Sequence, residues 1–291
     1  MKMIIPCIAS SLMASYAAAD PAAIRATADA DSPSPIHVVP SVLVGGEAFH
    51  YAEDAQLPLK SAHDAWLPTM RVAVDANALG DHLFGRVAFT GTYASMTYDG
   101  STQDGAPLSG HTSGHLTDTE LDIGGRFHVG PVTLGGYVGA AHHTWDRDFS
   151  GVMNGYREQY TWNYFPIALE ANVSIHALEL HAEVAALFTA PGTNHAYLSQ
   201  VSPMYADASM PVATGGGGRF ILSGTYPIRG ALRAVGRFSY ENQVAIQGPG
   251  VPFNFSDGTP VVDSNGNALF AAYPGASTTR ISVMAGASYG F

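Results

Sequence analysis

The chain has 291 residues, of which 46% are hydrophobic and 13% charged, and its formal net charge is −11. This acidic balance disfavours a nucleic-acid partner, because nucleic acids are bound by clusters of Lys and Arg. The single cysteine, Cys7, excludes a disulfide within the chain.

The first 19 residues predict a signal peptide. Lys2 precedes an apolar stretch, and Ala17, Ala18 and Ala19 form a small-residue cleavage pattern before Asp20. An N-terminal membrane anchor is the alternative, but the apolar stretch is shorter than the ~20 residues of a spanning helix. Residues 20–40 are rich in Ala, Asp, Ser and Pro without periodicity, so we expect a flexible periplasmic segment.

From residue 41 onward, apolar side chains alternate with polar or small ones in segment after segment. Met70, Val72 and Val74, for example, alternate with Arg71 and Asp75. Residues two apart share one face of a strand, so each segment predicts one apolar and one polar face. Ten strands are expected, at residues 41–52, 68–79, 82–98, 115–129, 131–146, 158–174, 177–189, 213–226, 229–244 and 277–291.

Short and long connections alternate between these strands. Tight turns are expected at residues 80–81, 130–131, 175–176 and 227–228, and the other five connections are long. Short turns on one side and long loops on the other are typical of membrane barrels. The predicted fold is all-β: a closed, antiparallel, up-and-down transmembrane β-barrel over residues 41–291, with short periplasmic turns and long extracellular loops. An even number of strands places both termini on the periplasmic side.

In the last strand, apolar residues alternate with polar or small ones, and the strand ends on Tyr289 and Phe291. This pattern resembles the closing strand of bacterial outer-membrane β-barrel proteins. The resemblance implies a location in the Gram-negative outer membrane, in contact with its lipid and lipopolysaccharide. It also implies insertion by the barrel-assembly machinery, with Tyr289 and Phe291 as the assembly signal.

The predicted register points seven arginines and eight acids into the lumen. Ten strands leave a narrow passage at most, an arginine can bridge two carboxylates, and an unpaired buried charge is costly. We therefore expect ion pairs to fill the lumen; a narrow porin-like channel lined by the same charges is the alternative. These residues are Arg71, Asp75, Arg86, Asp118, Glu120, Asp122, Arg126, Glu170, Glu179, Glu183, Arg219, Arg233, Arg237, Glu241 and Arg280.

Three aromatic-rich stretches predict residues of the interfacial belt of a membrane barrel. The alternation does not assign Glu47, Phe49 and Tyr137 to a face. The expected belt residues are Tyr160, Trp162, Tyr164, Phe165, Tyr226 and Tyr289.

Several histidines fall at strand ends or in long loops, near acidic residues. No metal site and no cofactor are expected from them, because no familiar ligand spacing occurs and the adjacent His142 and His143 face opposite ways on a strand. These histidines are His50, His63, His111, His115, His142, His143 and His195.

A membrane protease of the omptin kind is a second alternative. Omptins are ten-stranded barrels in which an Asp pair and an Asp–His pair on opposite walls activate a water molecule. Asp146 and Asp148 share one strand face, which can raise the pKa of one of them, and His63 adjoins Asp64. We expect no catalytic residues, since other omptin features are not visible.

The last long loop, residues 247–275, is rich in turn-forming residues and contains the apolar stretches 251–253 and 269–270. Asp263, Asn265 and Asn267 resemble part of a calcium loop, but Pro274 stands where the final glutamate is required. A loop that covers the barrel mouth or contacts a partner is expected. The predicted function is therefore a non-enzymatic barrel that presents its loops to an extracellular ligand or supports envelope integrity.

Overall fold

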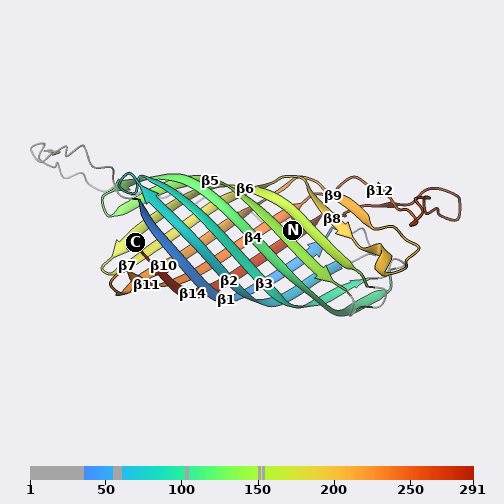
Figure 1. Cartoon of the computed structure of the whole chain (residues 1–291), viewed down its shortest axis with the longest axis horizontal. Coiled ribbons are helices and arrows are strands. Elements are labelled where there is room, and N and C mark those ends of the chain that lie inside the picture. Colours follow the sequence, from blue (N-terminus) through green and yellow to red (C-terminus); the bar gives the residue numbers. More distant parts are fainter. Residues whose placement is uncertain (1–35, 55–60, 102–104, 150–151, 153–154) are drawn as a thin grey trace, which may run out of the picture. The chain divides into compact units, whose positions relative to one another are not determined.

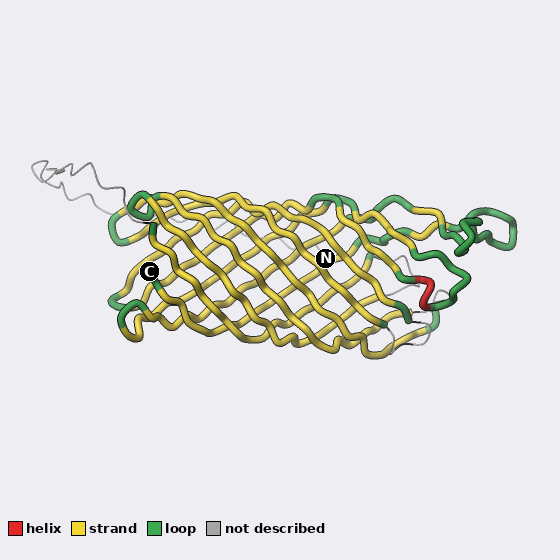
Figure 2. Tube along the Cα trace, viewed as in Figure 1, coloured by secondary structure: helices red, strands yellow, loops and turns green. Residues whose placement is uncertain are grey.

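The alternating segments form ten long antiparallel strands in the computed structural model, which describes residues 36–54, 61–101, 105–149, 152 and 155–291. The expected signal peptide and most of the expected flexible segment lie outside the described residues. Figures 1 and 2 show the ten strands winding obliquely around one barrel. They are β1 (His37–Glu53), β2 (Ser61–Ala78), β3 (Leu83–Ser101), β4 (Pro107–Val129), β5 (Val132–Asp148), β6 (Arg157–Ile175), β7 (Leu178–Thr189), β10 (Gly215–Arg229), β11 (Leu232–Ala245) and β14 (Ala276–Tyr289).

The sheet closes on itself, so no long strand keeps a free edge. Neighbouring strands follow the chain in order, β14 pairs with β1, and β5 pairs with β6. Such closure satisfies the backbone hydrogen bonds that lipid cannot satisfy. Two short strands, β8 (Gly192–Ala196) and β9 (Ala208–Val212), extend the sheet beside the upper part of β6.

The remaining regular elements lie in the long connections. A 3₁₀ turn, η2 (Leu198–Gln200), follows β8, and the two-residue strands β12 (Val251–Pro252) and β13 (Phe270–Ala271) pair with each other. Among the described residues, no helix is long and apolar enough to cross a membrane.

The first strand begins earlier than expected. β1 starts at His37, because residues 37–40 already pair with residues 74–77 of β2. The boundary of the flexible segment at residue 40 therefore falls inside a strand. The two ends of the described chain lie side by side, since Phe291 N donates a hydrogen bond to Val38 O at 3.0 Å.

The four tight turns lie at one end of the barrel, which we call the short-turn end, and the opposite end is the long-loop end. The turn expected at residues 227–228 is wrong: β10 continues to Arg229, and the chain reverses at Gly230 and Ala231. Tight hairpins require positive φ, which proline cannot adopt. Gly230 has φ +57°, so it is the residue that forms this turn.

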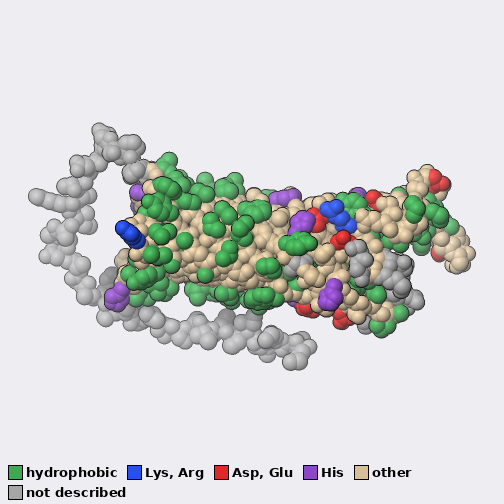
Figure 3. All heavy atoms as spheres, turned by 60° about the horizontal axis from the view of Figure 1, so that its bottom comes forward, with side chains coloured by type: hydrophobic (Ala, Val, Ile, Leu, Met, Phe, Trp, Pro, Cys, Tyr) green, Lys and Arg blue, Asp and Glu red, His purple; other side chains and the backbone are tan. Residues whose placement is uncertain are grey.

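The outer face changes character along the barrel axis. Figure 3 shows hydrophobic side chains over the wall of the short-turn half, with basic and histidine side chains at its tip, while acidic side chains and further histidines appear toward the long loops. In β6 the outward side chains are Leu169, Ile167 and Phe165 and then Asn163. The apolar part marks the membrane-spanning zone, and the barrel continues beyond it at the long-loop end.

Three expected belt residues point the wrong way. Tyr160 and Tyr164 are 1% and 2% exposed and lie inside the barrel, as does Trp162, which packs on His143. Above the membrane zone the outward positions of β6 are polar, so its inward positions hold the large aromatics. Phe165, Tyr226 and Tyr289 do face outward and are about half exposed.

Candidate functional site

The centre of the lumen is an ion-pair layer built around two arginines. Arg219 donates to both carboxylate oxygens of Glu120 at 2.7 Å, and its Nη2 also donates to the Tyr137 hydroxyl at 2.8 Å. Arg280 donates to Glu47 at 2.9 Å and to Asp118 at 2.8 Å. The Arg219–Glu120 and Arg280–Asp118 pairs join strands across the barrel, so the layer spans the lumen, whereas Arg280 and Glu47 lie on the neighbouring strands β14 and β1.

A second group of ion pairs lies nearer the short-turn end. Arg86 donates to Asp75 at 2.8 Å and lies 3.6–3.7 Å from Glu183 and Asp122. Arg126 donates to Glu170 and, at 2.8 Å, to Asn77. Arg219 also reaches this group, since its Nε lies 3.4 Å from Glu183. Together, these three arginines balance acids contributed by β2, β4, β6 and β7.

The remaining predicted lumen residues complete the network or line a small cavity. Arg233 pairs with Glu179 at 2.7 Å in an exposed position, and Glu241 lies within 4.0 Å of Arg219 and Arg280. Arg71 donates to Thr90 at 3.1 Å, while Nε of Arg237 has no hydrogen-bond partner among the described residues.

The cavity between these groups measures about 50 Å³. Arg71, Arg237, Glu241 and Tyr164 are among the residues that line it. This volume holds one or two water molecules, so this cavity is too small to serve as a passage for a solute.

An aromatic layer closes the barrel above the ion pairs. Phe49, Tyr51, Trp145 and Tyr160 are each 1–3% exposed and belong to one cluster with Tyr273. Other members come from β2, β3, β4, β8, β9 and β14, so the cluster crosses the whole section: Leu67, Met96, Leu116, Ala196, Met210, Val212 and Ala276. It is a packed core inside a membrane barrel.

Arg147 lies at the top of this aromatic layer. Its guanidinium carbon is 4.7–5.3 Å from the ring centres of Tyr51, Trp145, Phe149 and Tyr160. The same guanidinium donates to Glu158 and, at 2.8 Å, to Glu53. Cation–π contacts and paired carboxylates together stabilise this buried charge.

Sequence reasoning missed the upper layer and several partners in the central one. Glu47, Tyr137, His143 and Arg147 all take part, and His143 Nδ1 lies 2.6 Å from Asp118. The sequence signal for the upper layer is a change of pattern within a single strand. Toward the long-loop end, polar residues occupy the outward positions and aromatic residues the inward positions. Phe49 and Tyr137, which the alternation left unassigned, are lumen residues.

The predicted histidines divide between the two faces of the wall. His63 and His143 are buried inside, whereas His50, His111, His115, His142 and His195 lie on the outer side. Among the described residues, these seven do not form a metal-binding group.

The residues considered for an omptin-like site do not converge. Asp146 faces outward, where it accepts hydrogen bonds from Arg157 at 2.7 Å and lies 2.9 Å from His115. His63 faces inward, and its Nε2 accepts a hydrogen bond from Arg147 at 2.9 Å. The barrel wall separates the two side chains, and Arg147 occupies the lone pair that a general base needs.

The long loops form a joint surface, the loop platform, made of residues 198–210 and 247–275. Tyr205 stacks on Phe255, with ring centres 5.9 Å apart, and Ser256 N donates to Met204 O at 2.8 Å. Asp263 accepts hydrogen bonds from the Asn267 side chain and from Asn267 N and Asn265 N, which lowers the pKa of its carboxyl group. The stretch that resembles part of a calcium loop therefore forms a local turn.

Comparison with known proteins identifies the architecture. No protein-family model matches the chain, and no curated protein matches it. The solved structure of the outer membrane protease OmpT from Escherichia coli is similar, with a TM-score of 0.58, 12% identity, and coverage of 90% of this chain and 99% of that one. The chain has the fold of an outer-membrane β-barrel protein.

Other solved barrels match less closely. OprG from Pseudomonas aeruginosa has a TM-score of 0.38 at 9% identity and covers 89% of this chain and 97% of its own. Ail of Yersinia pestis, the attachment invasion locus protein, has a TM-score of 0.33 at 10% identity, covering 87% and 99%. At these identities the likeness concerns the fold alone.

Proposed function

We propose that this chain is a closed, non-enzymatic outer-membrane barrel that presents its long-loop end to a partner outside the cell. The observation that carries the proposal is the double obstruction of the lumen. An ion-pair layer with a cavity of about 50 Å³ lies below a packed aromatic layer. A solute would have to break both layers, which disfavours the porin-like alternative.

Planar-bilayer recording tests the closed lumen directly. Purified protein, folded in detergent and shown to be incorporated by flotation of proteoliposomes, is expected to give no unitary current. Stable, reproducible single-channel steps from folded protein would contradict the proposal and favour a narrow channel.

The loop platform supports the proposed contact with a partner. Met204, Val262 and Phe270 are 52–64% exposed there. Large apolar side chains exposed on one set of loops support a contact with a partner. The chain ends would then lie on the periplasmic side, with Tyr289 and Phe291 available to the assembly machinery during insertion.

The protease alternative makes a separate prediction. Incubation of the folded barrel with a library of short peptides is expected to give no cleavage, because Asp146 and His63 lie on opposite faces of the wall. Cleavage that disappears in Asp146→Asn or His63→Ala would overturn the non-enzymatic assignment.

A further inference from the structure

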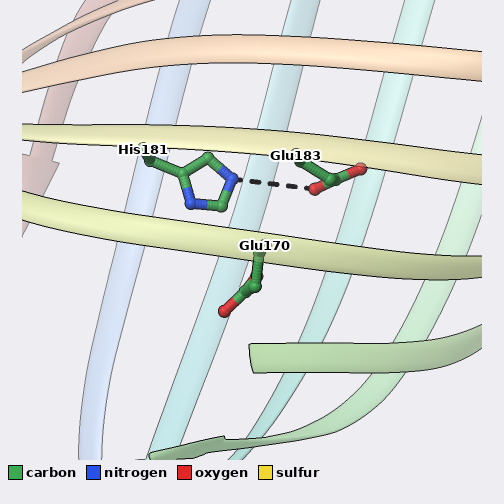
Figure 4. A group of neighbouring side chains, drawn as sticks. All are labelled: Glu170, His181 and Glu183. Atoms are coloured by element: carbon green, nitrogen blue, oxygen red, sulfur yellow. Dashed lines mark ion pairs between the residues drawn. The ribbon is translucent and has the colours of Figure 1, made fainter. Parts of the chain in front are cut away.

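Three chemically suitable side chains meet inside the barrel near its short-turn end. One ligand atom each from Glu170, His181 and Glu183 lies within 4.8 Å of the others. Figure 4 shows the three side chains on neighbouring strands. Glu170 of β6 stands directly opposite Glu183 of β7, and Asn172 stands opposite His181, so backbone pairing fixes their positions.

The two glutamates are strongly buried, at 3% and 1% exposure. Like charges directly opposite each other destabilise a sheet. Each glutamate has one oxygen that the protein binds: Arg126 donates to Oε1 of Glu170, and the Tyr137 hydroxyl donates to Oε1 of Glu183 at 2.6 Å. The other oxygen of each, Oε2, is buried without a hydrogen-bond partner among the described residues, although Oε2 of Glu183 has ion-pair contacts with Arg86 at 3.6 Å and with His181 at 3.7 Å. A buried carboxylate oxygen left in this state is costly.

His181 is oriented to accept rather than donate at this point. Its Nδ1 lies 2.8 Å from Oδ1 of Asn172, an acceptor, so in the neutral tautomer that fits this contact Nδ1 carries the proton and Nε2 a lone pair. Nε2 is 3.7 Å from Oε2 of Glu183, which is too long for a hydrogen bond. An imidazole held by a carbonyl oxygen on its other nitrogen is the usual arrangement of a metal-ligating histidine.

We propose that Glu170, His181 and Glu183 bind a divalent transition-metal ion, for which Zn²⁺ is the probe. One imidazole and two carboxylates suit such an ion, with bonds of about 2.0–2.2 Å and one position left for water. The bound ion would supply the short contact that the two Oε2 atoms lack and would link β6 to β7. Arg86 does not make a hydrogen bond to Oε2 of Glu183, because its Nη1 is 3.6 Å from that oxygen.

An ion would reach the site from the short-turn end. The His181 side chain is 17% exposed, whereas those of Glu170 and Glu183 are fully buried. The histidine therefore faces the accessible side, and the carboxylates lie deeper in the lumen.

Metal binding is tested on the folded full-length barrel in detergent, stripped with EDTA and dialysed against Zn²⁺. About one Zn²⁺ per chain is expected, with affinity at least tenfold lower in His181→Gln. Co²⁺ added to the wild-type barrel should give visible d–d absorption bands of a low-symmetry site, a readout that requires no variant. Absence of both stoichiometric Zn²⁺ and Co²⁺ bands would overturn the proposal.

The chain offers a matched control on its outer face. His142 Nδ1 lies 2.9 Å from Asn163 Oδ1 in the same cross-strand arrangement, and among the described residues it belongs to no metal-binding group. His142→Gln should retain Zn²⁺ at the wild-type level. An equal loss in His142→Gln and His181→Gln would also overturn the site, because it would indicate nonspecific binding to surface histidines.

Discussion

Individual lumen residues differ in importance because their burial differs. Arg219 contacts Glu120, Glu183 and Tyr137 with 8% of its side chain exposed, whereas Arg233 meets Glu179 with 42% exposed. Removal of a buried partner leaves the other charge without compensation, and this costs several kcal/mol. An exposed pair gains little from solvent-screened attraction.

Arg219→Ala is therefore expected to lower the free energy of unfolding by about 3–5 kcal/mol. Arg233→Ala should lower it by about 1 kcal/mol at most. Urea unfolding of the detergent-folded barrel, followed by tryptophan fluorescence, measures both. Similar losses in the two variants would show that the central layer does not stabilise the barrel.

Gly139 supplies the space that the ion-pair network needs. A Cβ atom there would lie 2.2 Å from Oδ1 of Asp122 and 2.9 Å from the backbone oxygen of Leu121. At Gly236, on the outer face of β11, a Cβ atom would meet no atom within 4 Å.

We expect Gly139→Ala to destabilise the barrel by about 1–3 kcal/mol, since overpacking shifts side chains or backbone. Gly236→Ala should be neutral or slightly stabilising, because alanine loses less backbone entropy than glycine in a strand. The same urea titration compares them, and a neutral Gly139→Ala would mean that Asp122 and the wall adapt freely.

At the scale of strands, the sequence predicts the barrel well because lipid selects one side of every strand. Charges such as Arg71 and Asp75 fix the register, since a slip of one residue would place them in lipid. The signal fails at the long-loop end, where water faces the outer wall and the apolar side chains turn inward. Tyr160 and Tyr164 were misplaced for this reason.

Partners across the lumen were not predictable from the sequence. Glu120 and Arg219 are 99 residues apart in the chain, and only the tilt and stagger of the closed sheet bring them together. The Glu170–Glu183 pairing depends on the β6–β7 turn at residues 176–177. The predicted turn at 175–176 is one residue early, which would place Glu170 opposite His181 instead.

This β6–β7 turn stores backbone strain that can be measured. His176 has φ +56°, a left-handed conformation that costs an L-residue roughly 1 kcal/mol, while Gly230 adopts φ +57° in the corresponding β10–β11 turn. His176→Gly is expected to raise the free energy of unfolding by up to about 1 kcal/mol, and Gly230→Ala to lower it by about as much.

Urea unfolding, with refolding yield as a second readout, follows this reciprocal pair. Because the two changes are nearly opposite at equivalent positions, shifts of the same sign would show that turn strain does not control stability here.

For the barrel as a whole, closure of the lumen and the loop platform are separable. Tyr273 belongs to the aromatic layer, but the segment 249–272 lies outside the aromatic cluster except for contacts made by Val251 and Ala271. Gly248 N donates to Tyr273 O at 3.2 Å, so the two ends of this segment are adjacent. A short Gly-Ser link can join them without displacing Tyr273.

Replacing residues 249–272 with this link should leave a folded, heat-modifiable barrel whose stability changes by about 1 kcal/mol or less, because surface loops tolerate shortening when their ends already meet. The variant should remain non-conducting, since both layers inside the lumen persist, while any binding through Val262 and Phe270 is lost. Gel mobility with and without heating, planar-bilayer recording and urea unfolding measure these outcomes. Unitary currents in the variant but not in the wild type would show instead that the last loop closes the mouth and that the aromatic layer is permeable on its own.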